Sequence, residues 1–294
     1  MTGRCCADLA ATDSQEALEA SIPSMTVHLR SLGYRTDLIF PSYDGQVADR
    51  GDYLVVRTPS NPTFYWGNFL LFRRPPDKGD ERRWRKLFAD EVGHPPRIRH
   101  EAFGWDSPDG ERGLVQPFLD AGFTLVTSRV LGAQRPKPPE HRISGVVVRP
   151  LGEESEWEQA LSLQLLCNVD HEPAGYRVFR QRQMARYRAM DGDGRGHWFG
   201  AFVDDAMVAD LGVFHDGDLA RFQSVETHPE FRRRGIAGTL VYEASKFMVS
   251  LYPTMTLVIV ADEGSAAERL YRSLGFQPLE LQMGLERWEP SAKG

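Results

Sequence analysis

The spacing of apolar residues in the second half of the chain predicts alternating strands and helices. Short apolar runs bounded by glycine, proline or aspartate indicate strands, and apolar residues three or four positions apart indicate helices. In chain order the predicted elements are a strand at 143–151, helices at 153–168 and 176–190, a hairpin of strands at 198–203 and 207–214, a strand around Phe222 and Val225, a helix with apolar residues from Leu240 to Leu251, a strand at 256–260, a helix at 265–273 and a strand at 279–285.

The first half predicts a similar but less regular alternation. Strands are expected at 53–56, 64–72, 98–105 and 124–131, the second of them buried on both faces because it is almost continuously apolar. A helix is expected to begin with Asp80 as its cap, and another is expected over 114–119. Residues 1–24 are polar and alanine-rich, which predicts a flexible N-terminal segment.

A proline-rich stretch divides the two halves. Prolines fit neither a central strand nor a helix interior, so 135–142 is predicted to be a linker. A length of 294 residues also favours two domains. We therefore expect one domain over 25–134 and a second over 143–294.

Composition narrows the class of protein. A net charge of −6 argues against a general nucleic-acid binder. No apolar stretch approaches the ~20 residues that span a bilayer, and the N-terminus has no secretory pattern, so a cytoplasmic protein without membrane contact is expected. Three cysteines are too few for a disulfide framework or zinc site, and no metal is expected.

The stretch from Phe222 to Tyr242 holds the candidate chemistry. A strand, a His228-Pro229 turn, three arginines and a glycine precede a helix. The first N–H groups of a helix lack partners within it, and the helix dipole adds partial positive charge there, so this order of elements suits a phosphate. The arginines alone would equally fit a solvated surface cluster.

This stretch resembles the acetyl-coenzyme A signature of the GNAT superfamily of N-acetyltransferases, [QR]-x-x-G-x-[GA], here Arg232 to Ala237. The preceding run from Val225 to Phe231 is similar to the V-x-P-x-[FY] sequence of that family. A second signature, N-x-x-A-x-x-L-Y-x-x-x-G-F, is similar to residues 264–276, which keep the alanine, Leu-Tyr and Gly-Phe. Gly264 replaces the asparagine, and Ser265 is a possible substitute for its contact.

The resemblance covers about residues 143–288 and implies an α/β (α+β) GNAT fold, with a mixed, mostly antiparallel sheet flanked by helices. The order of elements in the first half is similar to that in the second half. Residues 120–123, which precede a predicted strand, are also similar to residues 272–276. This half is therefore interpreted as a smaller, degenerate GNAT-like α/β domain. It lacks the arginine–glycine loop, so no cofactor is expected there.

The chemistry implied by the resemblance is direct transfer of an acetyl group from acetyl-CoA to the primary amine of a small molecule or peptide. A backbone N–H near Val225 would polarise the thioester, the backbone near Thr227 would pair with the pantetheine arm, and Tyr271 would protonate the thiolate. The implied donor-site residues are Val225, Glu226, Thr227, Arg232, Arg233, Arg234, Gly235, Ile236, Ala237, Gly238, Thr239, Ser265, Ala267 and Tyr271.

The general base stays open. Positions that hold it in some family members are Arg221 and Gln223 here, and neither accepts a proton. Glu226 is the preferred candidate and His228 a second, while 170–172 would face the acceptor. Trp66, Asn68, Trp105 and Asp106 are candidates for a substrate wall from the first half, although core packing is favoured for the tryptophans.

Two other functions fit the residues. One is a sensor or regulatory module that binds acetyl-CoA without turnover, and the other is a regulator that binds a different nucleotide. The second signature argues against the nucleotide regulator. A homodimer is possible, and the sequence does not identify the acceptor amine.

Overall fold

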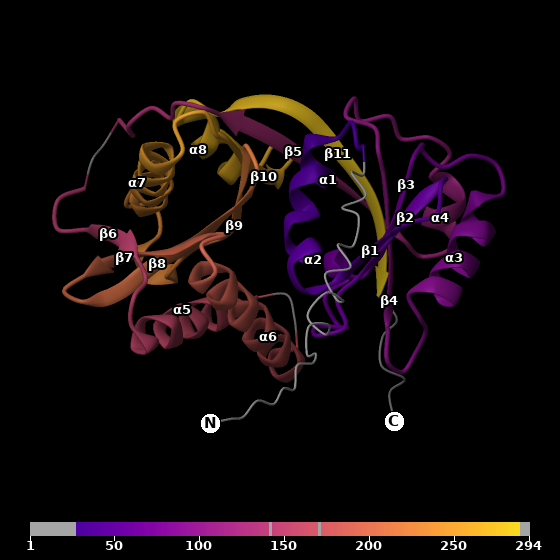
Figure 1. The fold of residues 1–294 in the computed structure, drawn as a ribbon, viewed down its shortest axis with the longest axis horizontal. Coiled ribbons are helices and arrows are strands. Elements are labelled where there is room, and N and C mark those ends of the chain that lie inside the picture. The colour runs from indigo at the N-terminus through magenta and orange to yellow at the C-terminus, as the bar shows by residue number, and fades with distance from the viewer. Residues whose placement is uncertain (1–27, 141–142, 170–171, 289–294) are drawn as a thin grey trace, which may run out of the picture.

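The computed structural model describes residues 28–140, 143–169 and 172–288, which form two lobes joined by one continuous sheet (Figure 1). The first half contains α1 (Leu32–Asp37), α2 (Ile39–Asp44), β1 (Gln46–Asp49), β2 (Tyr53–Arg57), the 3-10 turn η1 (Tyr65–Gly67), β3 (Phe69–Phe72), α3 (Asp80–Glu91), β4 (His100–Trp105), α4 (Gln116–Asp120) and β5 (Thr124–Ala133).

After an additional first strand, β6, the second half has the same order of α-helices and strands. It contains β6 (Val147–Pro150), α5 (Glu154–Leu166), α6 (Pro173–Gly192), β7 (Gly196–Val203), β8 (Ala206–Asp216), β9 (Leu219–Thr227), the 3-10 turn η2 (Pro229–Phe231), α7 (Ile236–Leu251), β10 (Thr256–Asp262), α8 (Ala266–Ser273) and β11 (Gln277–Trp288). In each half a helix pair is followed by three antiparallel strands, a helix, a parallel strand, a short helix and a final strand.

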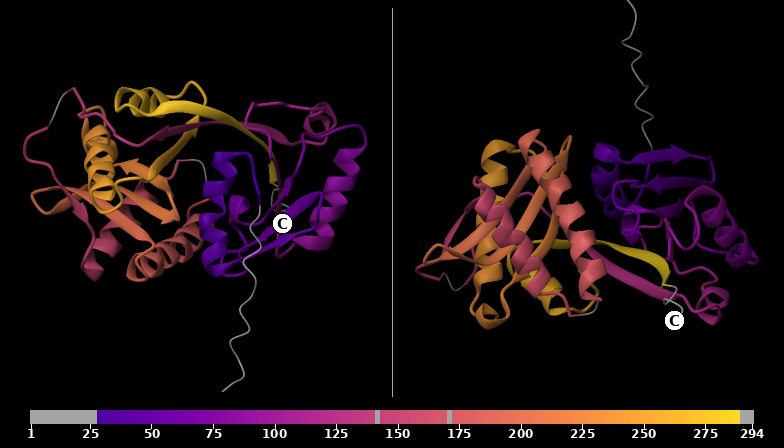
Figure 2. Two further views of the ribbon diagram at one scale, coloured as in Figure 1. Left: turned by 45° about the horizontal axis from the view of Figure 1, so that its top comes forward. Right: turned by 90° about the horizontal axis from the view of Figure 1, so that it is seen from below.

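The last strand of each half is inserted into the other half. The strand order is β1-β2-β3-β4-β11-β5-β10-β9-β8-β7-β6, so β5 lies between β11 and β10, and β11 lies between β4 and β5. Figures 1 and 2 show that both strands run from one lobe to the other. Among the described strands, only the pairs β3–β4 and β9–β10 are parallel. The predicted mixed, mostly antiparallel GNAT-type sheet is confirmed.

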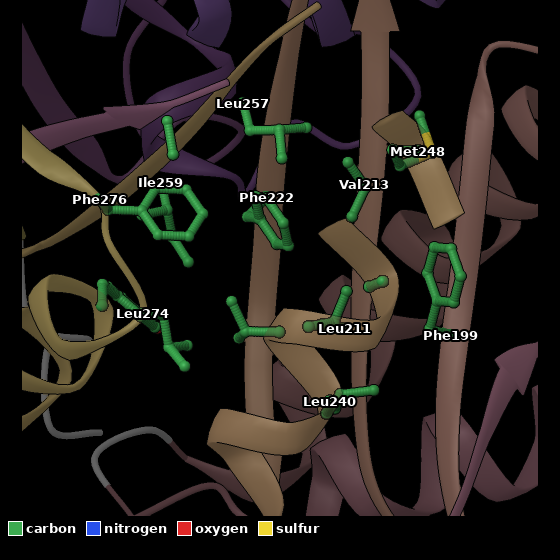
Figure 3. Packing of buried hydrophobic residues seen from close by; sticks show 14 of the residues in the cluster. Phe199, Leu211, Val213, Phe222, Leu240, Met248, Leu257, Ile259, Leu274 and Phe276 are labelled. Atoms are coloured by element: carbon green, nitrogen blue, oxygen red, sulfur yellow. The ribbon is translucent and has the colours of Figure 1, made fainter. Parts of the chain in front are cut away.

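Helices cover both faces of each lobe. In the second half, α7 and α8 pack on one face over a core that includes Phe222, Leu240 and Phe276 (Figure 3). On the opposite face, α5 and α6 bury a core around Trp198 that also receives Ile39 and Phe40 from α2. The first half has its own two cores, one under α3 and α4 and one under α1. The α1–α2 pair thus lies between the lobes.

Three sequence predictions need correction. The apolar run 64–72 is not one strand, because η1 interrupts it before β3 begins at Phe69. The predicted strand 143–151 is limited to β6, and Gly79 rather than Asp80 is the N-cap of α3. The helices α1 and α2 were not predicted, because each is only six residues long and α2 contains Pro41. The domain boundary at 135–142 stays a prediction, and the segment 1–24 that was expected to be flexible lies outside the described residues.

Candidate active site

The parallel strands β9 and β10 diverge, and this opens a gap in the sheet. Their pairing runs from Thr256 opposite Leu219 to Val258 opposite Arg221 and then stops. Beyond that point β9 stays paired only with β8, and β10 stays paired only with β5. The backbone of β9 from Phe222 to Thr227 therefore presents an unpaired edge to which an extended ligand can hydrogen bond.

A β-bulge lies on β9 beside the gap. The register with β8 shifts between Gln223 and Glu226, and Ser224 adopts a left-handed φ of 49°. An extra residue in one strand bends it and redirects its side chains. The bulge therefore accounts for the bend of β9 away from β10 and fixes the direction of Glu226.

The predicted anion site lies at the start of α7. Gly235 caps this helix with a left-handed φ of 79°, no side chain caps the first turn, and no acidic residue lies in it. Arg232, Arg233, Arg234 and Gly235 are exposed, and Arg233 is also left-handed with φ 60°. The first-turn N–H groups from Ile236 onward therefore have no side-chain partner and lie next to exposed positive charges, as anion binding requires.

The remaining predicted donor residues divide between exposed and packing positions. Ile236 and Gly238 are buried, and a Cβ on Gly238 would lie 3.3 Å from Leu270 of α8, so both also position α7. The hydroxyl of Thr239 donates to the Gly235 carbonyl at 3.2 Å. Ser265 caps α8 by accepting from the Glu268 N–H at 3.1 Å, which leaves its hydroxyl hydrogen as a donor. Ala267 packs against the α7–α8 core.

Tyr271 is buried on α8, in the core that α8 forms with β9 and β10. Burial, followed by the nearby charge of Glu226, raises the pKa of this phenol well above its ordinary value. Its hydroxyl forms no hydrogen bond within the described part of the chain. Tyr271 is thus a protonated phenol at neutral pH with its donor capacity unused.

Glu226 lies among three polar partners at the end of β9. Burial raises the pKa of its carboxyl group, and the Arg180 guanidinium, the Cys167 thiol and the Arg232 guanidinium oppose that rise. The carbonyl of Thr227 accepts from Cys167 Sγ at 3.5 Å and from Arg232 Nε at 3.1 Å. Burial and the Glu226 charge raise the pKa of the Cys167 thiol to about 11, so this thiol stays protonated.

The other candidate bases have structural contacts. His228 accepts the Glu230 N–H at 3.3 Å and packs edge-on against Phe231. Glu172 caps α6 by accepting the N–H groups of Ala174 and Gly175 at 2.8 and 2.7 Å. Residues 170 and 171, which were also predicted to face the acceptor, lie outside the described residues.

A buried polar network behind β9 was missed by sequence reasoning. Asp210 of β8 accepts from Gln164 Nε2 at 2.7 Å and Trp198 Nε1 at 3.0 Å, and burial raises its pKa to about 8. Gln164 also donates to the Ser224 carbonyl at 3.1 Å, and Arg180 donates to the Ser224 hydroxyl at 3.0 Å. The network fixes the bulge on which Glu226 depends. No pattern separates these residues from ordinary helix and strand positions.

Of the four first-half residues predicted as candidates for a substrate wall, Trp66, Asn68, Trp105 and Asp106, the structure places only Trp66 at a pocket. Trp66 lines a pocket between the lobes, together with Arg221 and Gln223. Trp105 is fully buried in the core under α3. Asn68 and Asp106 hold backbone N–H groups, Asn68 that of Thr58 at 2.8 Å and Asp106 that of Ser31 at 2.7 Å. Trp66 thus belongs to a possible substrate wall, and the other three residues are structural.

Within its described residues, from 28 onward, the first half has neither a gap between its parallel strands nor a helix start like that of α7. Its strands β3 and β4 stay paired to Phe72 opposite Trp105, where β3 ends. At the start of α3, the Asp80 carboxylate accepts the Asp77 N–H at 2.9 Å and pairs with Arg74 at 2.8 Å. The first turn of α3 thus carries negative charge of the protein itself, from Asp80 and Glu81, which disfavours a bound anion there.

Residues 28–140, 143–169 and 172–288 contain neither a cluster of metal-binding side chains nor a membrane-spanning helix. No group of three or more histidine, cysteine or acidic side chains is arranged to hold a metal ion. No helix in this part of the chain has the length and apolar character to cross a bilayer.

Comparisons with known proteins agree with this geometry. The model of the acetyltransferase (GNAT) family matches residues 157–276. Among curated proteins, none matches the sequence. One similar solved structure is a protein of unknown function from Staphylococcus epidermidis, with 13% identity and a TM-score of 0.65, covering 84% of this chain and 95% of that chain.

Two other similar structures are GCN5-related N-acetyltransferases. The protein from Kribbella flavida has 15% identity and a TM-score of 0.57, covering 88% of this chain and 95% of that chain. The protein from Sphaerobacter thermophilus has 14% identity and a TM-score of 0.53, with 86% and 85% covered. These matches extend over both halves, so the first half shares in the structural likeness. The chain therefore contains, over residues 157–276, an acetyltransferase domain of the GNAT family.

Proposed function

We propose that the protein is an N-acetyltransferase that transfers the acetyl group of acetyl-CoA to a primary amine within a ternary complex. The observation that supports this most is the combination of an uncapped, arginine-flanked helix start at Gly235 with the gap between β9 and β10. The pyrophosphate would bind the first-turn amides of α7, and the pantetheine arm would pair with the free edge of β9.

The reaction needs one bond formed, one bond broken and two proton movements. The amine nitrogen attacks the thioester carbon, the C–N bond forms, and the C–S bond breaks to release coenzyme A. An N–H at the bulge near Val225 would stabilise the oxyanion. Tyr271 would donate its proton to the departing sulfur. Its raised pKa keeps that proton in place until charge develops, although it makes full transfer less favourable than from an ordinary phenol.

Glu226 is the proposed general base, because it is the described carboxylate that acts on both Tyr271 and Cys167. A base must be deprotonated to accept the amine proton. Since burial raises the pKa of Glu226, kcat should rise with pH through that raised value and level off above it. We expect Glu226→Gln to lose this acidic limb and to lower kcat by about 10²–10⁴-fold. An unchanged pH profile in the variant would exclude Glu226 as the base.

Thermal unfolding with acetyl-CoA tests the donor site without knowledge of the acceptor. A ligand at a hundredfold over its Kd stabilises the folded state by about 2.7 kcal/mol. For a protein of this size the unfolding midpoint should rise by several degrees. Acetate at the same concentration should leave the midpoint unchanged. No shift with millimolar acetyl-CoA would exclude the proposed function.

The non-catalytic sensor remains the competing proposal, supported by Arg221 and Gln223 at positions that hold the base in some relatives of this fold. Arg221 pairs with Asp37 at 2.9 Å and cannot accept a proton. A sensor would show the thermal shift but release no coenzyme A with any amine. The protonated, unpartnered Tyr271 beside Glu226 favours the enzyme.

A further inference from the structure

A pocket of about 230 Å³ lies between the two lobes. Its walls come from α1, α2 and the η1 region of the first half, from α6 of the second half, and from the four central strands β11, β5, β10 and β9. Its lining includes the rings of Tyr34, Trp66 and Tyr187 and the charged side chains of Asp37 and Arg221. Neither half forms this pocket alone.

The pocket opens onto the gap in the sheet. Gln223 and Val260 line it, and each lies two positions beyond the last β9–β10 pair, Arg221 opposite Val258. On β9, Gln223 is paired with Gly212 of β8, and Glu226 is paired with Asp210. Gly212 and Asp210 are two positions apart, so they lie on one face of the sheet, and their partners Gln223 and Glu226 lie on that face too. A molecule in the pocket thus lies on the same side of the sheet as Glu226.

Aromatic rings form much of the wall, and internal contacts hold them. The Tyr34 hydroxyl donates to the Met283 carbonyl at 2.6 Å, and Trp66 Nε1 donates to Glu286 at 3.0 Å. Tyr187 stacks on Trp198 with ring centroids 4.9 Å apart. Because these rings are fixed before a ligand binds, little side-chain entropy is lost on binding a flat apolar group.

The charges in the pocket are already paired. Asp37 binds Arg221 at 2.9 Å and accepts from Gln282 Nε2 at 2.6 Å. Arg221 also donates to the Thr36 hydroxyl at 2.8 Å. Arg221 Nε also has no hydrogen-bond partner among the described residues, but it is buried from solvent, so it is not presented to a ligand. The other lining side chains without a partner there include Gln223 and Ser128, and both are uncharged. A ligand that carried a charge besides its amine would therefore lose the hydration of that charge in the pocket and gain no ion pair in return.

The volume also limits the ligand. Pockets for drug-sized molecules are typically about 300–1,000 Å³, so this one fits a smaller body. We propose, on the basis of the proposed acetyl transfer, that the acceptor is a small primary amine with a flat, apolar, otherwise uncharged body, of the arylalkylamine class. The ring occupies the pocket between the lobes, and the amine extends into the gap toward Glu226.

The first test compares four acceptors at equal concentration with the full-length protein and acetyl-CoA. They are 2-phenylethylamine, phenylalanine, spermidine and a lysine-containing peptide, with the acetylated products measured by mass spectrometry. We expect kcat/KM for 2-phenylethylamine to exceed the other three by at least tenfold. Phenylalanine adds a carboxylate to nearly the same body, so it isolates the effect of a second charge.

The second test fills the pocket. Val126 lines it, whereas Thr127 follows on the opposite face of β5. We expect Val126→Phe to raise KM for 2-phenylethylamine by at least tenfold while leaving the thermal shift with acetyl-CoA unchanged. Thr127→Phe is the matched control and should leave both quantities unchanged.

The outcomes separate this inference from the proposed function. Absence of the acetyl-CoA shift in the wild type defeats the proposed function and the inference together. A normal shift overturns the acceptor class alone if phenylalanine, spermidine or the peptide is preferred, or if no amine in the panel is acetylated. The placement of the acceptor is overturned if Val126→Phe folds, binds acetyl-CoA and keeps the wild-type KM.

Discussion

Tyr271→Phe is expected to lower kcat by about 10²–10⁴-fold while leaving the affinity for acetyl-CoA within about twofold of the wild type. The substitution removes one hydroxyl and keeps the ring that packs in the α7–α8 core. Since that hydroxyl has no hydrogen-bond partner in the described part of the chain, its loss should not destabilise the fold. Single-turnover release of coenzyme A measures the effect directly.

A tyrosine from the first half gives the control for this variant. Tyr53 is buried in β2, and its hydroxyl donates to Glu91 at 3.3 Å, in a core separate from the one that contains Tyr271. Tyr53→Phe should keep the wild-type kcat. If Tyr271→Phe also keeps it, the phenol is a packing residue and another group protonates the thiolate.

Gly235→Glu is expected to weaken acetyl-CoA binding by about 100-fold or more. The new carboxylate would lie at the start of α7 and compete with the pyrophosphate for the same amides and arginines. Loss of two hydrogen bonds to a charged group, at about 1.5–3 kcal/mol each, accounts for this magnitude. The measurement is the dissociation constant of acetyl-CoA by calorimetry.

The matched control for this substitution is Gly79→Glu. Gly79 caps α3 with a φ of 86° and ψ of −6°, close to the 79° and 2° of Gly235. Both variants force a glutamate into a left-handed conformation, at a cost of roughly 1–2 kcal/mol, so both should unfold at lower temperature. Only Gly235→Glu should lose acetyl-CoA affinity. Equal loss in both variants would show that the effect comes from backbone strain.

The donor side of the candidate site could be predicted from sequence because it is local. A single segment supplies the edge of β9, the arginines and the start of α7, and a second segment supplies α8 with Tyr271. The signals are glycine at a left-handed position and apolar residues at helical spacing. Both signals depend on a few neighbouring residues, so they can be recognised in the sequence alone.

The acceptor side could not be predicted, because its residues come together only in the folded chain. The ion-paired Asp37 and Arg221 lie far apart in sequence. Asp37 belongs to α1, a helix of six residues that is held by contacts with distant strands. One such contact is the hydrogen bond that the Gly33 N–H donates to the Glu280 carboxylate at 3.1 Å. Arg180 looks like one of several exposed arginines on α6 until its bond to Ser224 is known. Burial of such groups is a tertiary property, which propensity does not encode.

The exchange of the final strands explains why a half without a donor site of its own persists in the chain. Removal of the first half would take away both β4 and β5. One edge of β10 and both edges of β11 would then lack partners. Unpaired edges of this kind invite aggregation. The second half therefore depends on strands of the first half, although the first half has no gap between β3 and β4 of its own. The first half thus serves as a scaffold for the second, and mutations in it should alter the proposed activity of the second half.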